Sequence, residues 1–422
     1  MNKYKDIIGR INYGLFLALV ALLPFPQTLI RYACGLWLVS WLFEGRWLSK
    51  PKSLKENKMA IPFLLFGAWY AWKALSILWA PDHAAWAWWM ERYMLFALMI
   101  PVGLWGVNER YDWKVAGKVL IISCLVAIPG YLLWMTAVYV HPEWVPHLHL
   151  IEEWIHHDNW FVFVQENISH FKHRLFLCSV ELLAAVLACQ LFRKRLAILI
   201  PCLVVMLSII PLTGGRQSII TCAGFAIIGV LMALSHKKRL RYGLVIIAVG
   251  LTVGGGLLKL HPRMQGIKWS DITEMRELSY YHELRLNLWG AALQHPKDYL
   301  AYGLGAGQST QYMVERFADA HFDYYVQMRL HPHNQYLVEL MEIGIGGLLL
   351  FILAWLSIPI CAQKEGRRTA ILFITLFLLN MLTDCMFGKF DGIALWAVGL
   401  VFILLQTYAK GEKQTSRDTK TH

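Results

Sequence analysis

The tetrapeptide His331-Pro332-His333-Asn334 contains the side chains of this chain that are best suited to chemistry. It stands at the start of a long apolar segment, where two imidazoles and an amide are poorly explained by packing. An imidazole can accept or release a proton near neutral pH, so His333 is a candidate general base. The Asn334 amide can orient that imidazole or a substrate. The alternative is that His333 and Asn334 only cap a helix.

Arg216 is a candidate anion-binding residue. It ends a Thr-Gly-Gly-Arg turn, and Gly214 and Gly215 let the backbone approach a ligand closely. A helix is predicted to start just after this turn. Backbone amides at a helix N-terminus together with a guanidinium form a site for an anion, most naturally a phosphate. The alternative is an arginine that extends to the lipid headgroups.

Arg285 is the second candidate. It lies in a predicted amphipathic helix, with Trp289 one turn further on the same face. A second fixed positive charge would suit a diphosphate, whereas the alternative is an ordinary surface arginine. Arg174 opens another apolar segment and can face the same cavity. Arg263 and Arg276 are weaker candidates.

Four acidic residues lie in or beside apolar segments. Glu339 and Glu342 fall inside one, and ionisable groups within a membrane usually face a cavity or a partner. We expect one of them to pair with an arginine. Asp384 and Asp391 flank a short polar turn, where either can orient a substrate or pair with an arginine. The alternative for both aspartates is a solvated turn.

The composition indicates a polytopic all-α membrane protein. Hydrophobic residues make up 57% of the chain, the mean hydropathy is +0.45 and only 16% of residues are charged, against about 25% in soluble domains. Apolar windows near the roughly 17–25 residues that cross a bilayer predict about twelve transmembrane helices. The windows are 11–27, 28–43, 60–79, 90–106, 116–140, 174–192, 196–212, 217–235, 242–260, 335–361, 369–386 and 393–408.

The charges predict the topology. With the N-terminus in the cytoplasm, the cytoplasmic segments carry 25 of the 40 Lys and Arg residues, as the positive-inside rule requires. Both termini are then cytoplasmic, including a polar tail at 409–422. The basic run 237–241 is a topology determinant beside anionic lipid and gives no reason to expect nucleic acid. Histidine is distributed the opposite way, with 14 of 16 on or near the outer face.

Two long outer segments, 141–173 and 261–334, interrupt the single membrane domain 1–422. The second is expected to form a helical lid between the ninth and tenth spans, with amphipathic helices over 271–294 and 308–330. A flexible turn is expected at Gly303-Leu304-Gly305-Ala306-Gly307. In the first segment His147-x-His149 has metal-ligand spacing, but no cysteine supports it, and an interfacial aromatic cap is the preferred interpretation.

Several classes of function lack support in the sequence. There is no P-loop, no dinucleotide-binding glycine motif and no Cys-x-x-Cys. The eight cysteines lie in or at the ends of apolar segments, so no disulfide framework is expected in the outer segments. No cleavable signal peptide is apparent. Neither cofactor nor metal is therefore expected.

The motifs together resemble the O-antigen ligase and polymerase superfamily. The resemblance is carried, in order, by the Gly-Gly-Arg turn at 214–216, the Arg285…Trp289 helix, the glycine turn at 303–307, His331-Pro-His333-Asn334-x-x-Leu337 and Glu342-x-Gly344-x-Gly346. It covers residues 210–350, and the twelve predicted spans extend it to the whole chain. The length and predicted topology are most similar to the lipopolysaccharide O-antigen ligases.

This resemblance implies a membrane glycosyltransferase of the GT-C type. Such ligases transfer a glycan from undecaprenyl diphosphate to lipid A-core on the periplasmic face of the bacterial inner membrane, without a nucleotide or metal. By position, Arg216 and Arg285 match the arginines that contact the diphosphate, and His333 matches the histidine that activates the acceptor hydroxyl. The further candidates for substrate binding are Arg174, Gly215, Trp289, His331, Asn334 and Asp391.

Three rival functions remain open. An O-antigen polymerase uses the same donor but takes another lipid-linked glycan as acceptor, and a protein O-glycosyltransferase of the superfamily usually has a larger soluble C-terminal region. The rival of a different class is a transporter of lipid-linked glycan. Transporters show repeats or polar groups near the bilayer midplane, whereas the candidates here cluster at the outer rim.

Overall fold

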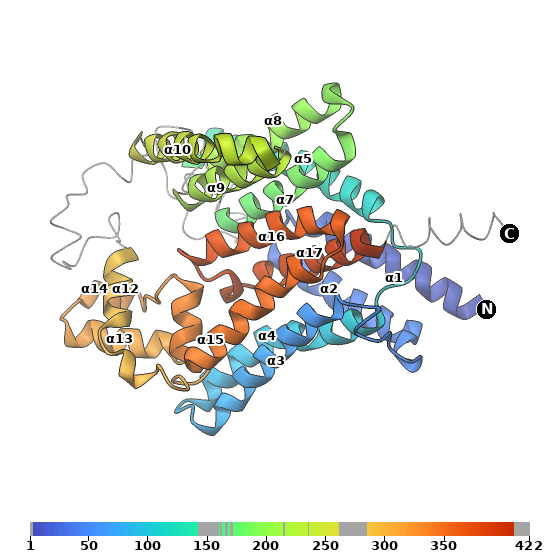
Figure 1. Ribbon diagram of the computed structural model, residues 1–422. Helices are drawn as coiled ribbons and strands as arrows, with labels where there is room; N and C mark the ends of the chain where they lie inside the picture. The colour runs from blue at the N-terminus through green and yellow to red at the C-terminus, as the bar shows by residue number, and fades with distance from the viewer. Residues whose placement is uncertain are drawn as a thin grey trace.

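The computed structural model describes residues 3–141, 160, 163–164, 168, 172–213, 216–234, 236–260 and 285–408. Within these residues every regular element is a helix (Figure 1). The long helices are α1 (Lys3–Leu22), α2 (Gln27–Glu44), α3 (Ala60–Leu75), α4 (His83–Trp105), α5 (Trp113–Val140), α7 (Arg174–Phe192), α8 (Leu196–Leu212), α9 (Arg216–Ala233), α10 (His236–Leu260), α15 (Gln335–Cys361), α16 (Lys364–Met381) and α17 (Phe390–Tyr408).

Each apolar window of the sequence overlaps one of these helices, although several windows extend past the helix end, and the bounds of α7, α8 and α15 coincide with their windows. Among the described residues, five helices are long and apolar enough to cross a membrane, and three shorter apolar ones accompany them. The chain is therefore a membrane protein. The full count of twelve spans stays a prediction, because helices such as α16 begin with several charged residues. The five are Ala60–Leu78, Trp113–Val140, Arg174–Phe192, Gln335–Cys361 and Phe390–Tyr408.

Helix α17 forms the centre of the packing. Nearly every residue from Asp391 to Thr407 is buried, and α17 contacts α2, α4, α5, α7 and α16. Around it aromatic rings interlock, with the Phe96 and Trp396 centroids 4.3 Å apart. Burial of such large rings stabilises a helix assembly even where lipid offers no hydrophobic driving force, because packing contacts are the main remaining attraction.

A group of short helices lies beside α15, on the opposite side of the molecule from the N-terminus (Figure 1). They are α12 (Arg285–Leu293), α13 (Ser309–Asp319) and α14 (Asp323–Gln327), and we call residues 285–330 the α12–α14 segment. The single helix expected over 308–330 is wrong, since His321 at φ 58° separates α13 from α14. This break brings Phe317 against Tyr325, with ring centroids 5.1 Å apart.

The glycine turn at 303–307 is docked rather than flexible. The Leu304 and Gly305 amides donate to the carbonyls of Met341 and Glu342, at 2.8 and 2.9 Å. Helix α15 opens at this point because Gly344 takes φ 68°. The three turn glycines also have positive φ, which explains why side-chain-free residues are needed there. The α12–α14 segment is thereby fixed to α15 through its backbone.

We expect Gly303→Ala to displace this turn. A Cβ at Gly303 would lie 2.3 Å from the Glu342 carbonyl, and φ is +85°. Overpacking of this kind costs about 1–3 kcal/mol, to which left-handed strain adds about 1–2 kcal/mol. Thermal unfolding in detergent should show a lower midpoint. Gly346→Ala is the matched control, because a Cβ there meets nothing within 4 Å; equal midpoints for the two variants would contradict the docking.

Several expectations concern parts of the chain outside the described residues. These parts are most of the segment 141–173, with His147 and His149, the residues 261–284, with Arg263 and Arg276, the turn glycines Gly214 and Gly215, and the tail 409–422.

Candidate functional site

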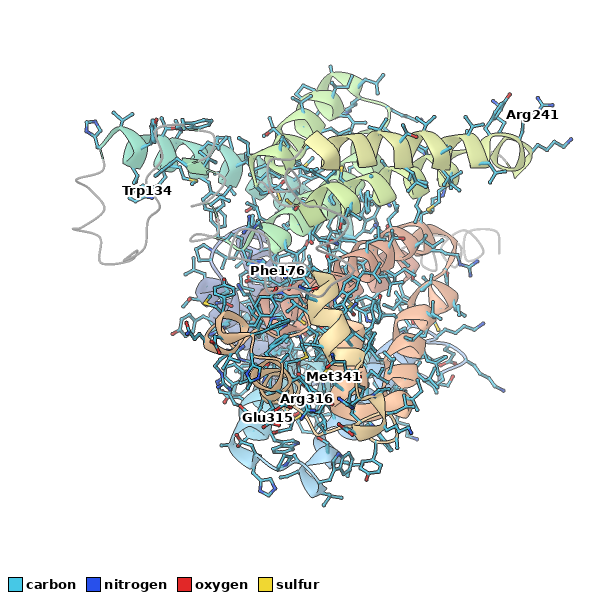
Figure 2. The ribbon with its side chains drawn as sticks, turned by 90° about the vertical axis from the view of Figure 1, so that its left-hand side faces the viewer. Trp134, Phe176, Arg241, Glu315, Arg316 and Met341 are labelled. Atoms are coloured by element: carbon cyan, nitrogen blue, oxygen red, sulfur yellow. The ribbon has the colours of Figure 1, made fainter. Side chains whose placement is uncertain are left out.

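A cavity of about 350 Å³ lies where α4, α7, α13 and α15 meet the turn between α16 and α17. Figure 2 shows one of its lining residues, Phe176 of α7, between the layer of α8–α10 and Met341 of α15. The lining combines charged, imidazole and aromatic side chains. It consists of Trp88, Trp89, Arg92, Tyr93, His173, Phe176, Ser309, Thr310, His331, His333, Gln335, Val338, Glu342, Asp384, Cys385, Gly388 and Lys389.

The two histidines of the tetrapeptide stack on each other at this cavity. Their ring centroids are 3.9 Å apart, and the His333 amide donates to Nδ1 of His331 at 3.1 Å. Burial lowers the pKa of His331 to about 3, with the neighbouring His333 acting in the same direction. His331 is therefore neutral at physiological pH. Its acceptor nitrogen is used to hold the His333 backbone, which has φ 48°.

Asn334 and Trp289 hold the same tetrapeptide from two sides. The Asn334 Oδ1 accepts from the Leu337 amide at 3.2 Å, so Asn334 is the N-cap of α15. The Trp289 indole donates to the Pro332 carbonyl at 3.1 Å. Both side chains fix the direction in which His333 projects. Their contact with a substrate stays a prediction.

Asp384 is the acidic partner of His333. Its Oδ1 lies 3.6 Å from Nδ1 of His333. Burial opposes ionisation of Asp384, but the contact with His333, together with His173 and Arg285, outweighs it and holds the pKa of Asp384 below its usual range. The pair is therefore a carboxylate beside an imidazole, the arrangement that orients a general base.

Asp391, the other aspartate of the turn, is placed differently. It is buried and forms an ion pair with Lys172, whose Nζ also donates to the Phe25 carbonyl at 3.0 Å. Arg174 follows two residues later at the start of α7, next to His173. Burial lowers the pKa of His173 to about 4, and Lys389 adds to the effect. The predicted roles of Asp391 and Arg174 in substrate binding stay predictions.

Arg285 begins α12 beside the cavity. Its charge acts on both His331 and Asp384, which lowers the pKa of each. It is half-buried, and Trp289 one turn further on joins α12 to the tetrapeptide. A cation thus lies near the two imidazoles, and the role of Arg285 in binding a diphosphate stays a prediction.

Arg216 is described only by its backbone, which starts α9. The next residue, Gln217, donates to the Leu379 carbonyl at 2.8 Å and accepts from the Thr383 hydroxyl. Thr383 directly precedes Asp384. The N-terminus of α9 is therefore anchored one residue away from the partner of His333.

Two further cations line the cavity, and the sequence interpretation did not assign either of them to the site. Arg92 of α4 donates to the Gly388 carbonyl at 3.2 Å and lies 3.4 Å above the centroid of the Trp88 ring. Lys389 follows Gly388, and burial lowers its pKa while Asp384 opposes that shift. Ionisable groups within a membrane segment usually face a cavity or a partner, and this rule was applied to Glu339. Arg92 also lies within an apolar window, so the same rule could have identified it.

Glu339 and Glu342 pair with a lysine rather than with an arginine. Lys73 Nζ lies 3.1 Å from Glu339 and 2.9 Å from Glu342, and all three side chains are at most 1% exposed. Trp69 and Gln335 donate to Glu339, at 2.9 and 2.7 Å. This cluster joins α3 to α15 in the apolar interior, where an unpaired charge is costly.

The same cluster reaches the cavity. Glu342 lines it and accepts from the Ser309 hydroxyl at 2.8 Å. The first turn of α13 is thereby held by the buried ion cluster. Among the described residues no group of three or more His, Cys, Asp and Glu is arranged to hold a metal ion. Independence from metal stays a prediction.

A comparison with protein families matches part of the chain. Residues 201–352 match the family described as O-antigen ligase. Over this segment the chain is similar to the O-antigen ligase family. The matched segment includes Arg216, Arg285, His331 and His333. The site residues Arg92, Asp384 and Lys389 lie outside it. A comparison with curated proteins found no match. This similarity supports a membrane enzyme of the O-antigen ligase and polymerase type.

Proposed function

We propose that the protein transfers O-antigen glycan from undecaprenyl diphosphate to lipid A-core. The observation that carries the proposal is the His333–Asp384 pair on a cavity that also contains fixed cations. Proton acceptance and stabilisation of a diphosphate are the two demands of this reaction, and the cavity offers groups for both.

In the proposed step His333 acts as the general base. Its Nδ1 faces Asp384 at 3.6 Å, which leaves Nε2 to accept the proton of the acceptor hydroxyl. The acceptor oxygen then forms a bond to the anomeric carbon while the bond from that carbon to the diphosphate oxygen breaks. The proton stays on His333, where Asp384 stabilises the imidazolium. A single displacement inverts the anomeric configuration.

The leaving undecaprenyl diphosphate gains negative charge as the bond breaks. Arg216 and Arg285 are proposed to stabilise this charge, together with Arg92 and Lys389, which line the cavity of His333. Cations that are already held in position stabilise a transition state most strongly where negative charge develops and water is excluded. The further residues proposed to bind substrate are Arg174, Gly215, Trp289, His331, Asn334 and Asp391.

An apolar cavity of about 480 Å³ between α8, α9 and α10 offers a place for the polyprenyl tail. Its lining is without charged residues and includes Ile219, Ala223, Ile227 and Val249. Arg216 stands at the first residue of α9, so a tail in this groove would lead its diphosphate towards the proposed site.

The proposal includes the arrangement in the cell. Twelve spans in a GT-C-type fold would place both termini in the cytoplasm and the cavity on the periplasmic face of the bacterial inner membrane. The segment 261–334 would then cover the site as a periplasmic lid. The distribution of basic residues in the sequence supports this orientation.

Complementation tests the proposal. In a ligase-deficient strain with undecaprenyl-linked O-antigen and a compatible core, the wild-type chain should restore the lipopolysaccharide ladder on a gel. Arg216→Ala and Arg285→Ala should each lower transfer by about 10²–10³-fold, as loss of one charge-stabilising donor does. Arg329→Ala is the matched control, because Arg329 is exposed and its side chain donates to Gln311, which does not line the cavity.

Other results would point elsewhere. If no ladder returns in any compatible core background while longer lipid-linked glycan accumulates, the protein is a polymerase. If neither changes at equal protein level, the transporter interpretation replaces the transferase.

A further inference from the structure

A second cavity, about 410 Å³ in volume, opens between α2 and α4 and shares Trp88 and Arg92 with the site cavity. We call it the α2–α4 cleft. Helices α2 and α4 both pack on α17, and Phe390 at the start of α17 forms part of the lining. The cleft is therefore a lateral extension of the site.

Two arginines stand at one end of the α2–α4 cleft. Arg31 is exposed on α2, donates to Gln27 at 3.2 Å and lies 5.8 Å from the Phe390 ring centroid. Arg92 projects from α4, and the two guanidiniums are close enough to act on each other electrostatically. In the part of the chain that the structure describes, neither forms an ion pair with a carboxylate, although the exposed Glu91 stands beside them.

The rest of the cleft is apolar. Leu38 and Gly35 line it from α2, and Met94 and Leu98 line it from α4 with 47% and 43% of their surface exposed. Leu98 follows Arg92 by six residues, which is about 9 Å along a helix. A Cβ added at Gly35 would meet nothing within 4 Å, so the cleft is open there. A cationic end above an apolar channel matches a phosphorylated headgroup above an acyl chain.

We propose that the α2–α4 cleft binds the acceptor glycolipid, with a headgroup phosphate between Arg31 and Arg92 and an acyl chain along Leu38 and Leu98. This inference rests on the proposed function. The phosphate between the two arginines is assigned to the acceptor and not to a bulk phospholipid. The reason is that Arg92, which lines both cavities, connects the cleft directly to the cavity of His333. A headgroup held there can extend its sugars into that cavity.

The test is binding of the acceptor without donor. The full chain in nanodiscs is titrated with fluorescent lipid A-core that carries its phosphates and with the same lipid after phosphate removal. Arg31→Gln should weaken binding of the phosphorylated lipid by about tenfold, as loss of one charge-assisted hydrogen bond does. It should leave binding of the dephosphorylated lipid unchanged.

Gly35→Leu tests the apolar part separately. The added side chain would fill the channel, so binding of both lipids should weaken. The matched controls are Arg10→Gln, an exposed arginine paired with Asp6 on α1, and Gly14→Leu, where a Cβ also meets nothing within 4 Å. Size-exclusion profiles of all four variants verify folding.

Three results would overturn the inference. Wild-type affinity in both Arg31→Gln and Gly35→Leu would remove the cleft as a binding site. An Arg31→Gln effect that follows the phosphatidylglycerol content of the nanodisc, and not the phosphate of the acceptor, would assign the arginines to bulk lipid. The binding experiment does not require glycan transfer, so it tests the cleft separately from the ligase function. If the acceptor binds with the expected pattern but no ladder is restored, the ligase function is refuted and the cleft remains a binding site. A restored ladder without such binding would refute only the cleft.

Discussion

His333→Gln is expected to lower the rate of glycan transfer by about 10²–10⁴-fold, the usual contribution of a positioned general base. The glutamine amide is similar in size and keeps a polar group at the cavity, but it cannot accept the proton of the acceptor hydroxyl. Donor and acceptor binding should change little, because His333 is proposed to act on the proton alone. Single-turnover transfer with purified donor and acceptor measures the chemical step directly.

Asp384→Asn provides the matching test of the pair. The amide retains the shape of the carboxylate, whose Oδ1 lies 3.6 Å from the imidazole, but removes the charge that stabilises a protonated His333. We expect a smaller loss than for His333→Gln and no further loss when both changes are combined. His321→Gln, at an exposed histidine between α13 and α14, is the control. Wild-type turnover in His333→Gln would eliminate the histidine as base.

Lys73→Met is expected to destabilise the protein by about 3–5 kcal/mol, the cost of leaving a buried charge without its partner. Glu339 and Glu342 are at most 1% exposed and share this one ammonium, at 3.1 and 2.9 Å. Methionine fills a similar volume but leaves two carboxyl groups in an apolar interior. The thermal unfolding midpoint in detergent should fall sharply, and little protein should remain monodisperse.

A compensated variant separates charge from packing. Lys73→Met combined with Glu339→Gln and Glu342→Gln removes all three charges and should recover most of the midpoint, because neutral groups are far cheaper to bury. Lys118→Met, at an exposed lysine of α5, is the control and should behave as wild type. If the free energy of unfolding of Lys73→Met lay within about 1 kcal/mol of the wild-type value, the cluster would not hold α3 to α15.

The helices of this protein were largely predictable from the sequence. Apolar length and the breaks between apolar windows are local properties, so the bounds of α8 and α15 match their windows. The tetrapeptide at 331–334 was also identifiable, because two imidazoles before an apolar helix contrast with their surroundings. The structure accordingly places both His331 and His333 on the cavity.

The internal structure of the α12–α14 segment was less predictable. Its polar composition did not reveal that the turn at 303–307 bonds to the backbone of α15, since that contact requires Gly344 to open the helix. Positive φ at His321 likewise broke a helix that the amphipathic pattern predicted to continue. At the glycine turn a tertiary contact therefore overrides the local preference.

The sequence by itself determined the all-helical membrane class, the positions of the long helices and the presence of imidazole and guanidinium groups along the matched segment. Only the tertiary structure decided which charges meet. It paired Lys73 with glutamates more than 260 residues away, placed Asp384 rather than Asp391 beside His333, and brought Arg92 to the cavity. The physical reason is that hydropathy acts along one helix, whereas the partner of a buried charge depends on which helices become neighbours.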